Sequence, residues 1–176
     1  MGSPTAAHLL LRLVAVRTAR AQKGEGMRIL GATCTSSTAF FALMDDETYI
    51  DDDLRRIDVA DILEEGERLL ELRERLRVEI MRIQPDAVAL MGSISKPRSY
   101  AVAAERATIE TMIRFVAQEL GIPCGRLQHP TIRARLDLPR TGQFNGHART
   151  FFDEEHQPYW GERCEAAAVA VAWQRA

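Results

Sequence analysis

The sequence predicts a single α/β domain in which a mixed β-sheet is flanked by helices. Two apolar runs near the start of the core are separated by a short polar turn, as in a hairpin of two strands. Two later segments repeat apolar residues at helical spacing, and a short apolar run of strand type follows each of them. Strands first, then helix, strand, helix, strand and helix, is an order typical of α/β proteins.

The hairpin strands are expected at residues 28–34 and 39–44, with the polar turn 35–38 between them. Residues 48–50 and 54–59 predict a third, more exposed strand that three consecutive aspartates interrupt. Three aspartates in a row also suggest a cation site. Acidic runs usually stay in water, however, so we interpret these aspartates as a solvated turn.

The clearest helix is predicted at residues 61–83, where apolar residues recur at sevenfold spacing from Ile62 to Ile83, with Asp61 as the expected N-cap. A wholly apolar run at 87–91 between turn residues predicts a central strand covered on both faces. The remaining elements are a helix at 100–120, a short strand that opens at 122–124, a small helix at 130–136, a long loop at 138–161 and an alanine-rich last helix at 162–173. A loop of that length is either functional or mobile.

Composition limits the classes of function. The chain has 176 residues, 46% of them hydrophobic, which suits one domain with a core that needs neither disulfides nor metals. A net charge of −2 excludes a strong overall field that would gather nucleic acid, so any such contact must be a local patch. The cysteines Cys34, Cys124 and Cys164 are far apart and odd in number, which argues against a disulfide framework or a zinc site and favours a cytoplasmic location.

Residues 1–26 differ from the rest of the chain, because they are basic and contain no acid before Glu25. The apolar stretch 9–16 is short and Arg12 interrupts it, so we expect neither a signal peptide nor a membrane anchor. Two interpretations stay open: a basic amphipathic helix, and a start codon assigned upstream of the true one at Met27. We therefore expect an N-terminal extension, 1–26, followed by the domain, 27–176.

Short motifs follow one another through the domain: MRILG at 27–31, QPDAVAL at 84–90, GIP at 121–123 with HPT at 129–131, and a last helix that carries Glu162 and Glu165. In their order and spacing they resemble the RuvC family of Holliday-junction resolvases, within the RNase H-like superfamily. The resemblance implies an RNase H-like (RuvC-type) fold, a homodimer, and four carboxylates that hold two magnesium ions for phosphodiester cleavage.

The resemblance also implies that half of this carboxylate set is missing. Thr33 stands where the family has its first aspartate, and Met91 stands where it has its glutamate. A threonine hydroxyl is a weak neutral ligand and a thioether is too soft for magnesium, so two-metal cleavage is expected to fail. Only Glu162 and Glu165 remain acidic. They are either a residual site for one Mg²⁺ or Mn²⁺ ion or an ordinary pair of acids at a helix start.

Other residues could supply the missing chemistry. Three acids near strand ends are candidates to replace the lost carboxylates: Asp45, Asp46 and Asp86. A nucleophile or metal pair could be built from Cys34, Cys164, His147 and His156. We favour the simpler interpretation, in which the cysteines are small buried residues and the histidines lie on a loop surface.

The most basic part of the core follows Cys124, and it suggests a surface that binds the phosphates of nucleic acid. The candidate nucleic-acid-binding residues are Lys96, Arg98, Arg126, Arg133, Arg135 and Arg140. The alternative is a set of scattered solvated arginines. The leading hypothesis is a non-catalytic RuvC-like module that binds DNA or RNA or serves in assembly. The alternatives are a metal-dependent endonuclease of altered site geometry and a scaffold that binds a protein partner.

Overall fold

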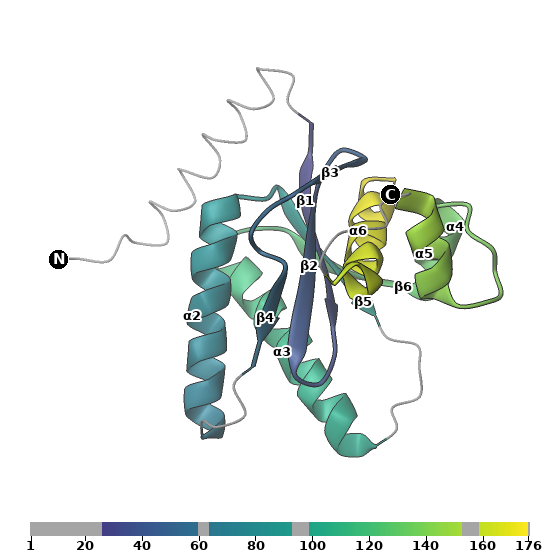
Figure 1. The fold of residues 1–176 in the computed structure, drawn as a ribbon. Coiled ribbons are helices and arrows are strands. Elements are labelled where there is room, and N and C mark those ends of the chain that lie inside the picture. Colours follow the sequence, from purple (N-terminus) through teal and green to yellow (C-terminus); the bar gives the residue numbers. More distant parts are fainter. Residues whose placement is uncertain (1–25, 60–63, 93–98, 153–158, 176) are drawn as a thin grey trace.

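A computed structural model describes residues 26–59, 64–92, 99–152 and 159–175 (Figure 1). Its strands are β1 (Arg28–Cys34), β2 (Thr38–Asp45), β3 (Thr48–Ile50), β4 (Arg56–Asp58), β5 (Ala87–Gly92) and β6 (Cys124–Gln128). Its helices are α2 (Glu65–Ile83), α3 (Tyr100–Glu119), α4 (His129–Arg135), α5 (Phe144–Phe152) and α6 (Trp160–Gln174). Several predictions fall outside the described residues, namely those for residues 1–25, Asp61, Lys96, Arg98 and His156.

The strands form one mixed sheet in the order β3-β2-β1-β5-β6, with β4 also paired to β2. β1 and β2 are antiparallel, whereas β1–β5 and β5–β6 are parallel pairs. The register places Gly31 opposite Ala89 and Ala32 opposite Leu90, so β1 and β5 end side by side. The prediction of a single α/β domain with a mixed sheet flanked by helices is confirmed.

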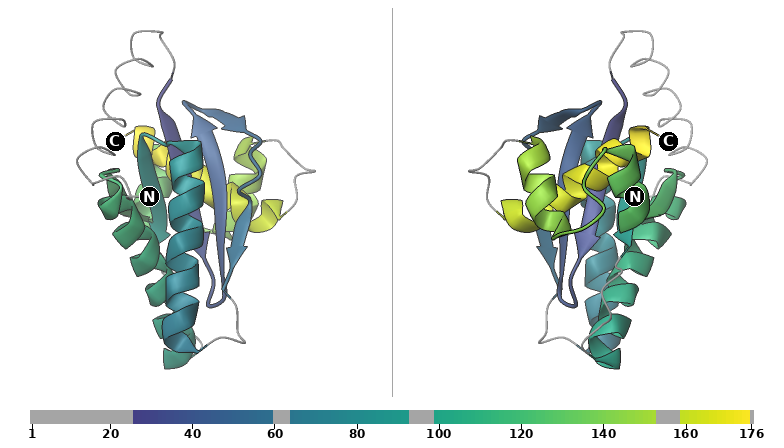
Figure 2. Two further views of the ribbon diagram at one scale, coloured as in Figure 1. Left: turned by 90° about the vertical axis from the view of Figure 1, so that its left-hand side faces the viewer. Right: turned by 90° about the vertical axis from the view of Figure 1, so that its right-hand side faces the viewer.

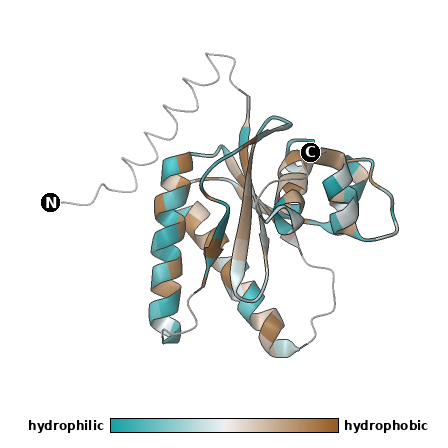
Figure 3. Cartoon of the chain, viewed as in Figure 1, coloured by the Kyte–Doolittle hydropathy of each residue, from teal (hydrophilic) through white to brown (hydrophobic). Residues whose placement is uncertain are grey.

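Helices cover both faces of the sheet (Figure 2). One layer is α2 and α3, which pack on the strand residues Leu30, Ala32 and Cys34. The other is α6 with α4 and α5 beyond it, and α6 packs on the alternate residues of the same strands, among them Ile29 and Met91. Side chains along a strand point to alternate faces, so Thr33 shares the α6 face with Ile29. Figure 3 shows the central strands as largely apolar and α2 as polar on its outer side.

Helix α6 lies unusually close to β1, because Gly31 and a run of buried alanines remove the side chains that would separate them. A β-carbon at Gly31 would overlap the carbonyl oxygen of Ala166. The buried side chain of Arg163 connects α6 to β2 and β3. Its Nε donates to the carbonyl oxygen of Phe41 at 3.0 Å, and its Nη2 donates to the hydroxyl of Tyr49. The contacts of Gly31 and Arg163 therefore fix the start of α6 relative to β1, β2 and β3.

Two sequence predictions of secondary structure were wrong. The supposed loop 138–161 contains α5, whose buried Phe144 and Ala148 lie four residues apart and pack with Trp160 of α6 in one core cluster. The single third strand is two strands, because β3 and β4 pair with different parts of β2. The strand predicted to open at residues 122–124 begins at Cys124 and runs to Gln128. Among the described residues, no helix is both long enough and apolar enough to cross a membrane.

Candidate functional site

Thr33 and Met91 lie near the ends of the neighbouring central strands β1 and β5, and Glu162 and Glu165 lie in the first turns of α6, which packs on these strands. Thr33 precedes the last residue of β1 and Met91 precedes the last residue of β5, and both side chains are buried. On α6, Glu162 and Glu165 come shortly before Ala166. The carbonyl oxygen of Ala166 lies against Gly31 of β1. The gathering of the two acids with Thr33 and Met91 in one functional site stays a prediction.

The two acids of α6 have different surroundings. Glu162 is exposed, whereas Glu165 is partly buried, and this burial raises the pKa of the Glu165 carboxyl to about 7. The positive charge of Arg106 opposes that rise in pKa, and the negative charge of Glu162 adds to it. A carboxyl that keeps its proton near neutral pH is a weak ligand for a hard cation.

The pKa of Glu165 predicts a pH dependence of stability. In the folded state its carboxyl holds a proton up to about pH 7, while its ordinary pKa is 4.5, so the folded state binds more protons than the unfolded state between these values. The free energy of unfolding should therefore fall as the pH rises from about 4.5 to about 7, and then level off. Urea unfolding of the Glu165→Gln variant should lose this slope, and the exposed control Glu67→Gln should keep it. Equal slopes in both variants would contradict the assignment.

A buried acid on α3 adds a group that the sequence prediction missed. Glu110 has a side chain only 8% exposed, and its two carboxylate oxygens form ion pairs with two arginines. Arg106, one turn earlier on α3, donates from Nε at 2.9 Å, and Arg126 of β6 approaches with Nη2 at 3.3 Å. The i,i+4 spacing of Arg106 and Glu110 was the available sequence signal, but it indicates an ordinary surface pair on a helix.

The guanidinium of Arg106 lies among the elements that form the site. Its charge acts on the pKa values of Cys34 at the end of β1, His129 at the start of α4 and Glu165 on α6. Its Nη2 is buried and has no hydrogen-bond partner within the described residues. A fixed cation thus stands near the end of β1, between α3 and α6.

These residues do not fit two magnesium ions. Within the described ranges, no three His, Cys, Asp or Glu side chains are grouped so that they could hold a metal. Glu110 already has two arginine partners, and the carboxyl of Glu165 has a raised pKa. Two-metal sites need several ionised oxygen ligands converging on one place. The donor set here disagrees with the metal pair that the resemblance to resolvases implies.

The idea that other acids replace the lost carboxylates was wrong. Asp45 pairs with Arg28 at the first residue of β1, and the Asp86 carboxylate accepts the backbone N–H of Arg28 at 2.9 Å. Asp46 accepts the backbone N–H of Met27 at 3.0 Å. All three therefore lie at the start of β1, roughly 17 Å of extended strand from Thr33. They cannot act at the ends of β1 and β5, where Thr33 and Met91 lie.

The prediction that the cysteines are buried residues is confirmed for Cys34 and Cys164. Burial raises the pKa of each of these thiols to about 12, so neither is an ionised nucleophile at neutral pH. The prediction that His147 lies on a loop was wrong, because it belongs to α5, where its Nε2 is hydrogen-bonded to the carbonyl oxygen of Thr141 at 2.9 Å.

The predicted basic residues have different surroundings. Arg126 belongs to the Glu110 group and remains 43% exposed. Arg133 is buried, and its guanidinium donates to the carbonyl oxygens of Pro139 and Gly142, while Arg135 donates to the carbonyl oxygen of Ala172 at 2.9 Å. Arg140 is exposed and has no hydrogen bond or ion pair with any described residue. The direct contacts of these arginines with nucleic acid stay a prediction.

Comparison of the whole fold with solved structures gives clear matches. Thermus thermophilus RuvC superposes with a TM-score of 0.69 at 14% identity, over 85% of this chain and 94% of that one. The fold is that of RuvC. The structure of T. thermophilus RuvC with a Holliday junction substrate matches at a TM-score of 0.67 and 15% identity, over 85% of this chain and 93% of the other.

A eukaryotic structure shares the RuvC-type fold. The yeast mitochondrial Holliday junction resolvase Ydc2 matches at a TM-score of 0.59 and 10% identity, over 85% of this chain and 78% of the resolvase. No protein-family model matches the sequence, and no curated protein matches it either. At these identities the likeness establishes the fold, and function has to be argued from the site.

Proposed function

We propose that this chain is a non-catalytic RuvC-like module that binds nucleic acid, acts as a homodimer and works in the cytoplasm. The observation that carries the first part is the Arg106–Glu110–Arg126 group beside Thr33 and Met91. It places guanidinium charges on the protein itself near the ends of β1 and β5. DNA is the favoured ligand, because one of the matching structures is described as bound to a Holliday junction substrate.

Electrostatics supports binding without cleavage. Cleavage by two metals needs an anionic cradle that collects divalent cations and activates a water molecule. Here the buried carboxylate of Glu110 is neutralised by arginines, and Glu165 carries a proton up to about pH 7. A centre of this composition attracts phosphate oxygens rather than magnesium, because arginine matches the geometry of phosphate.

Binding should therefore not depend on divalent metal. We expect a fluorescently labelled four-way DNA junction to bind with the same affinity, within about twofold, in excess EDTA and in Mg²⁺ after correction for ionic strength. Fluorescence anisotropy with the junction, a linear duplex and a single-stranded RNA measures this affinity and the preferred ligand. Absence of salt-sensitive binding to all three would contradict the proposal and favour a protein-binding scaffold.

A further inference from the structure

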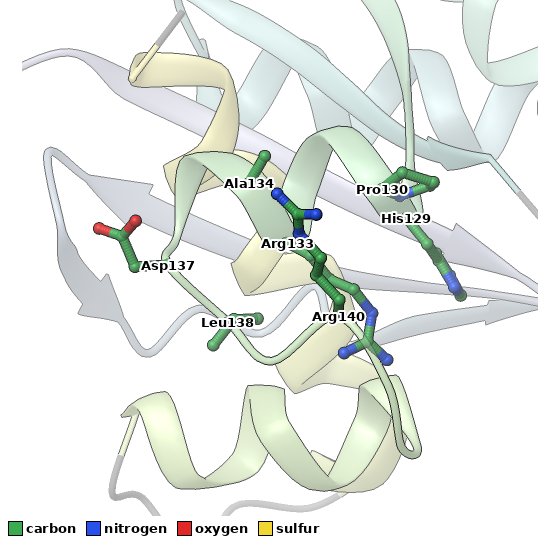
Figure 4. Close-up of a pocket in the computed structure, with 7 residues that line it drawn as sticks. All are labelled: His129, Pro130, Arg133, Ala134, Asp137, Leu138 and Arg140. Atoms are coloured by element: carbon green, nitrogen blue, oxygen red, sulfur yellow. The ribbon is translucent and has the colours of Figure 1, made fainter.

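A groove runs along α4, next to the candidate site, and its volume is about 740 Å³. The residues that line it come from α4 and the chain that follows: His129, Pro130, Arg133, Ala134, Asp137, Leu138 and Arg140 (Figure 4). It begins near the end of β5 that carries Met91. Gly92, the last residue of β5, pairs with Gln128, and His129 follows Gln128 in the chain. A nucleic-acid strand that crosses the ends of β1 and β5 could continue into the groove.

The charge of Arg133 is not neutralised by any described carboxylate. Its guanidinium is held by carbonyl oxygens of the loop after α4, at 2.8 Å from Gly142 and 3.5 Å from Thr141, with a further hydrogen bond to Pro139. It also lies 5.4 Å from the centre of the Phe144 ring. Neutral partners fix the position of this cation and leave its full positive charge beside the groove.

Arg140 provides a second positive charge that is exposed and unpaired within the described residues. Figure 4 shows Asp137 at the other end of α4 from His129, with its carboxylate turned away from the other lining residues. Asp137 is the only acid among the lining residues. The end of the groove nearest the candidate site is therefore positive.

His129 completes this end of the groove. Its ring stacks on Phe144 at 4.5 Å, and its Nε2 is buried without a hydrogen-bond partner among the described residues. Burial lowers its pKa, and the charges of Arg133 and Arg106 lower it further. The neutral ring therefore lies in a positive field and keeps one polar atom unused.

We infer that the Arg140 end of the α4 groove binds a backbone phosphate of the nucleic acid. Arg140 makes the direct contact, and Arg133 shapes the loop and adds its charge. A volume of about 740 Å³ leaves room for the sugar attached to that phosphate. This inference rests on the proposed nucleic-acid binding and names the part of the surface that does it.

The test compares two charge reversals in the full chain. Arg140→Glu removes the proposed contact. Arg114→Glu is the control, since Arg114 is an exposed arginine of α3 whose charge acts on Cys124, at the opposite end of β6 from Gln128. We expect Arg140→Glu to weaken binding of the labelled junction by about tenfold and to reduce the slope of log affinity against log salt by about 0.9. We expect Arg114→Glu to change affinity by less than about twofold.

The outcomes separate the two proposals. If the wild-type chain binds the junction and Arg140→Glu binds equally well with the same salt slope, the groove assignment is wrong and the module proposal stands. Equal losses in both variants would mean a diffuse charge effect and would also overturn the groove assignment. If the wild-type chain binds no nucleic acid, both proposals fail. Thermal unfolding of each variant shows that it is folded, and Arg140→Lys should retain part of the affinity.

Discussion

Replacing Gly31 by alanine is expected to destabilise the domain by about 3 kcal/mol or more, the largest single effect predicted for this fold. The added β-carbon would overlap the carbonyl oxygen of Ala166, and that oxygen belongs to the backbone of α6. Backbone cannot rotate away as a side chain can, so α6 would have to move off β1. Because α6 carries Glu162, Glu165 and Arg163, its displacement would also disturb the candidate site.

Gly66 in α2 is the matched control for this change, because a β-carbon there would meet nothing within 4 Å. Gly66→Ala should raise the free energy of unfolding by about 0.5–1 kcal/mol, since alanine is the better helix former. Urea unfolding followed by circular dichroism measures both variants. Similar stabilities for Gly31→Ala and the wild type would show that α6 is not packed on β1 as described.

Replacing Glu110 by glutamine is expected to destabilise the domain by about 3 kcal/mol, because it leaves the buried part of Arg106 without a counter-charge. The side chains of Glu110 and Arg106 are 8% and 21% exposed, so water screens this pair poorly. Glutamine keeps the shape of the side chain, which confines the effect to the lost charge. Chemical unfolding at pH 8 measures it.

The control for this change lies on the same helix. Glu119 pairs with Arg73 at 2.7 Å, but both side chains are about a third exposed, at 31% and 36%. Glu119→Gln should therefore cost less than about 1 kcal/mol. The double variant Arg106→Met with Glu110→Leu should recover much of the stability lost by Glu110→Gln, since apolar residues can replace a buried ion pair. Equal costs for Glu110→Gln and Glu119→Gln would contradict the buried ionic group.

The sheet was predictable from the sequence because its central strands are largely apolar and bounded by turn residues. The same was not true of α5. Asn145 and Gly146 are poor helix formers, and its apolar stripe from Phe144 to Phe152 is too short to establish a period. What stabilises α5 is packing between Phe152 and Trp160, with ring centres 6.0 Å apart, and this contact exists only in the folded chain.

The candidate site was only partly predictable. Thr33, Met91, Glu162 and Glu165 could be placed because motif order fixed their positions on strands and on the last helix. Arg106 and Glu110 could not, because charged residues on an amphipathic helix usually face water, and their partner Arg126 lies on another element. Arg133 also resembles a surface residue in sequence. The loop carbonyls that bury its guanidinium come together only through the turn after α4.

The most direct test of the central claim is a cleavage assay. Purified chain is incubated in excess with labelled four-way junction and linear duplex in Mg²⁺ or Mn²⁺, and the strands are separated on a denaturing gel. We predict that the junction is bound but stays uncut, at a level indistinguishable from an EDTA control. Metal-dependent cleavage by the wild type that Glu162→Ala abolishes would contradict the account and establish an endonuclease of altered geometry.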